Sequence, residues 1–206
     1  MKNLKKINIG ISFLIIILNT VFVILTLLNK FNSNILVCLS LYVIVFLPTI
    51  IRKLFKIEVA DSVELVFLIF IFFAQLLGSV MHLYSFIYWY DSFVHFTSGS
   101  LTALLALMLL VLFNKYDEKS SAFNVLYMFA ITLMIAAVWE TFEFTSDSLL
   151  GGDAQRVLTT GVGDTMKDII CAFLGCTLVS LSYVYEQVNS TKLLVNRFLD
   201  NVKKTK

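Results

Sequence analysis

Long apolar runs separated by short polar segments make up most of this chain. A helix needs roughly 20 mostly apolar residues to cross a bilayer. Six runs approach or exceed that length, and the second is the shortest; they cover residues 7–28, 35–51, 63–84, 93–113, 123–146 and 165–185. Strands of a membrane barrel would alternate apolar and polar residues, whereas these runs are apolar on all sides. The pattern therefore predicts an all-α, polytopic membrane protein, a six-helix bundle that forms one transmembrane domain over residues 1–206.

Composition supports the same class of protein. Of the 206 residues, 59% are hydrophobic and 19 are Phe, and the mean hydropathy is +0.88. A soluble domain is usually about 45–50% apolar, so the surplus apolar surface needs lipid as its solvent. Nothing in the sequence is typical of nucleic-acid binding, and nothing in it specifies an oligomeric state.

The positions of Lys and Arg predict the orientation in the membrane. Thirteen of the 16 basic residues fall before the first run, between the second and third, between the fourth and fifth, or after the sixth. The other set of segments holds Lys30 and Arg156, with Lys167 at the start of the sixth run. Basic residues concentrate in cytoplasmic loops. We therefore expect both termini to be cytoplasmic.

With this orientation, ionisable residues of three successive spans reach the outer side of the membrane. The fourth span begins with Asp91 and His95, and the sixth with Asp164 and Asp168, each pair one helical turn apart. The fifth span ends with three acidic residues whose spacing places them in one stripe: Glu140, Glu143 and Asp147. The sequence thus predicts one shared polar site within residues 91–168.

Several carboxylates placed close together repel one another, and an acidic residue inside a span costs up to roughly 2.5–3.5 kcal/mol. A bound cation, shared protons, or pairing with Arg156 and Lys167 would each relieve the repulsion. A divalent ion (Zn²⁺, Mn²⁺, Mg²⁺ or Fe²⁺) suits carboxylate and imidazole ligands. The predicted metal ligands are His95, Glu140, Glu143, Asp147 and Asp168.

Catalytic and counter-charge roles are also predicted at this site. Asp91, His95 and Asp164 are the catalytic candidates, although Asp91 and Asp164 could simply cap their helices. Arg156 and Lys167 are expected as counter-charges, with binding of a substrate phosphate as the second interpretation. The segment 148–163 carries four glycines and is long enough to fold over a site.

Three motifs resemble the YjdF-like family of bacterial inner-membrane proteins. They are the string from Asp91 through His95 to Gly99, the Trp-Glu-Thr-Phe-Glu string that starts at Trp139, and the Gly-Asp-Thr-Met-Lys-Asp string that ends at Asp168. The match covers a little over half of the chain. It implies a multi-pass protein of the bacterial cytoplasmic membrane.

A more distant resemblance links the chain to VanZ-like membrane proteins, which are associated with teicoplanin resistance. The shared features are an Asp-x3-His-Phe opening, a glutamate helix, and Leu-Gly in the last span. The usual Glu-x2-Gln of those proteins is Glu140-x2-Glu143 here, and their usual Arg corresponds to Arg156. This resemblance implies a role with cell-wall or lipid-linked intermediates.

Three functions follow as hypotheses. The first is a metal-dependent hydrolase or transferase that acts at the outer leaflet on membrane lipids or lipid-linked envelope substrates. The second is a non-catalytic envelope-defence protein that binds a lipid or antibiotic headgroup. The third is a proton- or cation-coupled transporter, which would use the same carboxylates.

Cysteine labelling tests the orientation. A membrane-impermeant maleimide should label Arg156→Cys in intact cells and Lys115→Cys only after the cells are opened, because the two positions lie on opposite sides of the membrane in this topology. The reverse pattern would invert the orientation.

Overall fold

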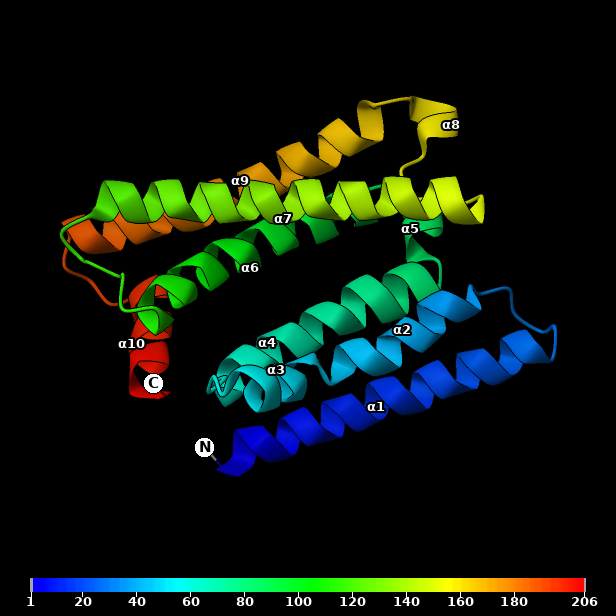
Figure 1. The fold of residues 1–206 in the computed structure, drawn as a ribbon, viewed down its shortest axis with the longest axis horizontal. Helices are drawn as coiled ribbons and strands as arrows, with labels where there is room; N and C mark the ends of the chain where they lie inside the picture. The colour runs from blue at the N-terminus through cyan, green and yellow to red at the C-terminus, as the bar shows by residue number, and fades with distance from the viewer. Residues whose placement is uncertain (1, 206) are drawn as a thin grey trace. The chain divides into compact units, whose positions relative to one another are not determined.

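The structure, a computed structural model, describes residues 2–205, and these form helices without a β-strand (Figure 1). In chain order the elements are α1 Lys2–Leu27, α2 Ile35–Val45, α3 Leu47–Phe55, α4 Asp61–Ile71, the π-helix η1 Phe72–Val80, α5 Leu83–Phe86, α6 Tyr90–Leu112, α7 Ser121–Leu150, α8 Val157–Thr160, α9 Gly163–Val188 and α10 Val195–Thr205.

The predicted all-α membrane class is confirmed. Five helical segments of the described residues are long and apolar enough to cross a membrane, and α2 with α3 forms a sixth candidate bent by 51°. The bend falls at Phe46, and Pro48 stands in the first turn of α3. Proline is tolerated there because an N–H group in the first turn has no partner within the helix, so its absence costs no hydrogen bond. The third predicted run is also irregular, since it passes from α4 into η1 before the chain turns at His82.

The contacts divide the chain into two compact units, one reaching Asp91 and the other running from Ser92 to Lys204. In the first unit α1 packs against α2, α4 and η1. Two buried amides of α1 join it to its neighbours: Asn8 Nδ2 donates to the Asp61 carbonyl and Asn19 Nδ2 to the Cys38 carbonyl, both at 2.8 Å. An amide buried among apolar helices needs such a partner, so these bonds fix the position of α1.

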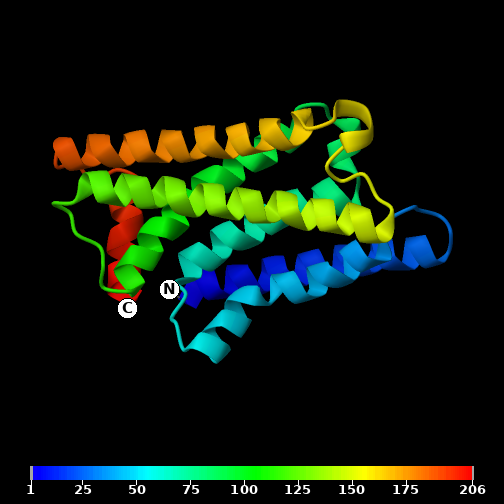
Figure 2. The same ribbon diagram turned by 45° about the horizontal axis from the view of Figure 1, so that its top comes forward.

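The second unit is built on α6, α7 and α9 (Figure 2). The chain runs along α7, turns through residues 151–162, and returns along α9, so these two helices are antiparallel neighbours. Helices α6 and α9 run in the same direction. The buried core of the unit contains residues from α6, α7, α9 and α10: Ala103, Ala106, Leu107, Leu110, Val111, Met128, Cys176, Val179, Tyr183, Val195, Leu199 and Val202.

Large apolar side chains also cover the outer faces of the spans. Phe13 on α1 is 62% exposed, and Leu126 and Val138 on α7 are 67% and 63% exposed. Apolar surface on this scale is not left facing water in a soluble monomer. These faces are therefore the ones that lipid covers.

The C-terminal helix α10 is anchored by one buried carboxylate near the end of α9. Glu186 is 0% exposed, and its two oxygens accept the backbone N–H groups of Leu193, Val195 and Asn196 at 3.1, 2.8 and 2.8 Å. The first N–H groups of a helix have no partner within the helix, and a carboxylate at that end also favours the helix dipole. Glu186 is thus the N-terminal cap of α10, supplied from another helix.

Replacing Glu186 should detach α10. Glu186→Ala leaves three backbone N–H groups of a buried helix start without an acceptor, at roughly 1 kcal/mol or more each. We expect faster tryptic cleavage at Arg197 and a lower unfolding temperature in detergent. Glu186→Gln keeps one acceptor oxygen and should show a smaller loss; equal stability of the Ala variant and the unmodified protein would contradict the capping role.

Candidate functional site

The predicted polar residues gather where α6 and α9 begin and α7 ends. The segment 151–162, which contains α8, joins α7 to α9 at this same end (Figure 1). The boundary between the two compact units falls in the first turn of α6, so Asp91 is carried by the same continuous helix as His95. The site is therefore described from α6 onward.

Three of the predicted residues form a compact group of potential metal ligands. One ligand atom each from Asp91, His95 and Asp168 lie within 4.8 Å of one another. His95 Nε2 is 3.8 Å from Asp168 Oδ2, with side chains 14% and 4% exposed. Helix α6 places Asp91 and His95 one turn apart on one face, and the first turns of α9 bring Asp168 to them. The sequence predicted this convergence of the fourth and sixth spans.

A close crossing of α6 and α9 fixes that group. A Cβ atom added to Gly99 would lie 2.0 Å from the Ala172 carbonyl oxygen, and one added to Gly175 would lie 2.0 Å from the Phe96 carbonyl oxygen. Ser100 Oγ donates to the Gly175 carbonyl at 3.2 Å across the same contact. Small residues permit such backbone approach between membrane helices. His95 and Asp168 each lie one turn before this crossing.

Asp164 belongs to an ion cluster beside the Asp–His–Asp group. It is 6% exposed, and its carboxylate lies 2.5 Å from Lys167 Nζ and 3.7 Å from Arg156 Nε. Lys167 Nζ is also 3.7 Å from Asp168 Oδ1. The N-cap position of α9 is Val162, which makes no side-chain cap, and the Asp164 carboxylate in the first turn pairs with the two cations. The expected counter-charge role of Arg156 and Lys167 is present in these contacts.

Glu140 of α7 has a different partner, in the segment 151–162. The Gln155 side-chain amide donates to the Glu140 carbonyl at 3.0 Å, to Glu140 Oε2 at 3.3 Å and to Thr165 Oγ1 at 3.3 Å. Glu140 is 6% exposed, and its Oε1 is buried without a hydrogen-bond partner among the described atoms. Gln155 therefore ties α7, the segment 151–162 and α9 together.

The two other acids of α7 also have their own partners. Glu143 accepts a hydrogen bond from Trp139 Nε1 at 2.9 Å, one turn away on the same helix. Asp147 accepts the backbone N–H groups of Ala154 and Gln155 at 2.8 and 3.0 Å, which holds the segment against the end of α7. Glu140, Glu143 and Asp147 thus lie at the predicted end of α7 but outside the group formed by Asp91, His95 and Asp168.

The role of Gln155 in joining α7 to α9 is not predicted by any pattern in the sequence. Gln155 lies in a segment without hydrophobic periodicity, and a lone glutamine there carries no spacing signal. Its role depends on the path of the chain between Asp147 and Thr165, which the residue pattern does not specify.

The fold and this site define a class: a multi-pass α-helical membrane protein with a buried Asp–His–Asp group at one end of two spans. The chain belongs to the family described as "Predicted membrane protein (DUF2238)", whose model matches residues 11–188. An uncharacterized protein of Thermotoga maritima is 27% identical over 141 residues, which is 67% of this chain and 70% of that protein. No solved structure matches the chain. The resemblance to YjdF-like and VanZ-like proteins remains an expectation from the motifs.

The crossing of α6 and α9 can be tested with alanine. Gly99→Ala and Gly175→Ala each place a methyl group against a backbone carbonyl, which should lower the unfolding free energy by about 1–3 kcal/mol. Gly10→Ala is the matched control, because no atom lies within 4 Å of its added Cβ. Unfolding curves in detergent measure all three, and equal stability for the three variants would contradict the close crossing.

Proposed function

We propose that this protein binds a divalent metal ion through Asp91, His95 and Asp168 and uses it on the phosphate group of a lipid or lipid-linked envelope substrate. The observation that carries the proposal is the compact Asp–His–Asp group, which two helices hold beside a close backbone crossing.

The donor set suits a divalent ion. Two carboxylates and one imidazole can serve Zn²⁺, Mn²⁺ or Fe²⁺, and three protein ligands leave a position for substrate or water. Ligand atoms around one such ion lie about 3.4 Å apart when the bonds are about 2.1 Å long. The ligand atoms, now within 4.8 Å of one another, would therefore approach by up to about 1.4 Å around the ion, which rotamer adjustments of Asp91 and Asp168 can supply.

Two cationic side chains near the site, Arg156 and Lys167, favour a substrate with an anionic group. The Arg156 and Lys167 side chains are 32% and 37% exposed, so both can contact such a group while they stay near Asp164.

The neighbouring segment favours a lipid as the carrier of that anion. Leu149, Leu158 and Val162 are 78%, 84% and 70% exposed around Arg156. Apolar side chains next to a span enter the boundary between headgroups and acyl chains. In that position Arg156 and Lys167 would lie at the depth of lipid phosphates. A bound ion would supply polarisation of a phosphoryl oxygen or an activated water.

Metal binding can be measured directly on the purified full chain in detergent. After chelator treatment, calorimetric titration with Mn²⁺ or Zn²⁺ should give one site per chain. His95→Ala and Asp168→Ala should each weaken binding at least about 100-fold, because each removes a ligand. Glu143→Gln is the matched control, since Glu143 bonds Trp139 instead.

Unchanged affinity in both ligand variants would place the ion elsewhere. A full-length protein that binds neither metal would overturn the enzymatic proposal.

One observation favours a second function, non-catalytic binding of an anionic headgroup. Arg156 and Lys167 lie together at Asp164 with side chains 32% and 37% exposed, so two cationic groups are available to an anion without a metal. Under this alternative, a phosphate-bearing lipid binds to metal-free protein and Lys167→Gln weakens that binding, whereas His95→Ala leaves it unchanged.

A further inference from the structure

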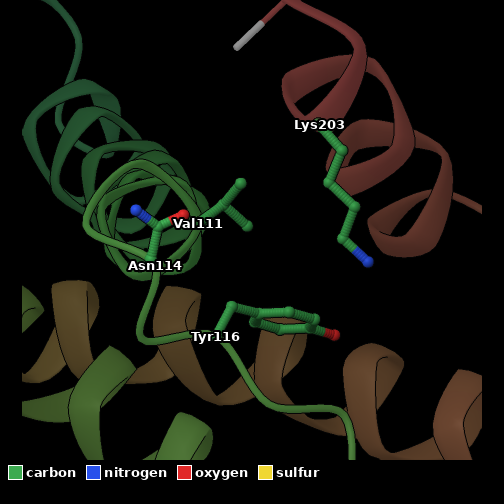
Figure 3. Close-up of a pocket in the computed structure, with 4 residues that line it drawn as sticks. All are labelled: Val111, Asn114, Tyr116 and Lys203. Carbon is green, nitrogen blue, oxygen red and sulfur yellow. The ribbon is translucent and has the colours of Figure 1, made fainter.

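The opposite end of the second unit contains a pocket that the proposed metal site does not use. Its volume is about 300 Å³, and Val111, Asn114, Tyr116 and Lys203 line it (Figure 3). These residues come from the end of α6, from the chain just beyond it, and from α10. We propose that this pocket binds the headgroup of an anionic phospholipid. The proposal is independent of the metal site.

The position of the pocket points to a headgroup. Helix α6 is a candidate span that ends at Leu112, and Asn114 and Tyr116 follow within a few residues. Groups just beyond the end of a span lie where lipid headgroups begin. Val111 forms an apolar wall on the side of the span, and the amide, phenol and ammonium groups lie beyond it.

The charge of the surrounding surface selects an anionic lipid. Residues 192–204 carry four basic side chains and one acidic one, a formal net charge of +3. Basic residues next to a span attract anionic lipids by about 1 kcal/mol each. Lys203 Nζ lies 4.8 Å from the Tyr116 ring centre and 2.9 Å from Glu118 Oε1. The Glu118 side chain is 66% exposed, so this ion pair is weak and a phosphate can compete for the ammonium group.

Tyr116 can donate a hydrogen bond to a ligand. Asn124 Nδ2 donates to Tyr183 Oη at 2.8 Å, and Tyr183 Oη lies 3.4 Å from Tyr116 Oη. This contact is long for an O–H···O hydrogen bond and either hydroxyl can donate in it, so a ligand oxygen can compete with Tyr183 for the Tyr116 proton. Burial and the neighbouring Tyr183 raise the pKa of Tyr116, so the phenol remains a donor at any physiological pH. A phosphate oxygen is an acceptor of the required kind.

Helix α10, which carries Lys203, is held in place by its buried face and its N-terminal cap. Val195, Leu199 and Val202 of α10 are buried in the core of the unit, and the Glu186 carboxylate caps the helix. Lys203 follows Val202 directly, so its ammonium group extends from a fixed backbone. A pre-organised site loses less conformational entropy when a ligand binds.

The test uses the delipidated full chain in a neutral detergent, with native mass spectrometry to count bound lipids. Phosphatidylglycerol should bind at least about fivefold more tightly than phosphatidylcholine with the same acyl chains. Lys203→Gln should reduce phosphatidylglycerol affinity about fivefold, and Tyr116→Phe should also reduce it. Glu118→Gln should raise it, because the competing carboxylate is removed.

Lys204→Gln is the matched control, since it removes the same charge from the neighbouring position but does not line the pocket. Its affinity should change less than twofold. Equal losses for Lys203→Gln and Lys204→Gln would overturn the pocket in favour of general charge attraction. Absence of a preference for phosphatidylglycerol would overturn the headgroup assignment, and so would equally tight binding of inorganic phosphate.

Discussion

The contact between the backbones of α6 and α9 at Gly99 and Gly175 is the constraint on which the candidate site depends. Neither position has room for a Cβ atom, because each would place it 2.0 Å from a carbonyl oxygen of the other helix. Membrane helices gain little from burying apolar surface against each other, since lipid is equally apolar. Close packing and interhelical hydrogen bonds must therefore hold the pair, and Ser100 supplies such a bond. This crossing fixes the distance between His95 and Asp168.

Burial of charge at the beginning of these spans has a cost that the surrounding contacts offset. Asp164 and Asp168 are 6% and 3% exposed. Arg156 and Lys167 form ion pairs with Asp164, and His95 lies beside Asp168. Glu140 accepts a hydrogen bond from the side-chain amide of Gln155. Lys167 links the ion cluster of Asp164 to the Asp–His–Asp group, because its Nζ lies within 4 Å of both Asp164 and Asp168.

Hydrophobic length and the spacing of polar residues were sufficient to predict the spans and part of the site. The i,i+4 pairs on the fourth and sixth spans predicted that His95 and Asp168 would meet, because such residues share a helix face. The acids of α7 were predicted to join them, but local partners intervene: Trp139 lies one turn from Glu143, and Asp147 binds backbone N–H groups of the following segment. Spacing along one helix does not reveal such competitors.

Two further features of the fold, helix α10 and the bend between α2 and α3, have a pattern in the sequence. Val195, Leu199 and Val202 have the period of an amphipathic helix, and the chain's one proline, Pro48, marks the bend between α2 and α3. The capping of α10 by Glu186 depends on how the chain returns after α9, and nothing in the residue pattern specifies that path. The π-helix η1 likewise has no distinct pattern within its apolar run.

The most direct measurement of the central claim is anomalous X-ray diffraction from crystals of the full chain grown with Mn²⁺. Our account predicts one anomalous peak between α6 and α9, within bonding distance of His95 Nε2 and an Asp168 carboxylate oxygen. A peak elsewhere, or an ordered Asp91–His95–Asp168 group that binds no ion at saturating Mn²⁺, would contradict it.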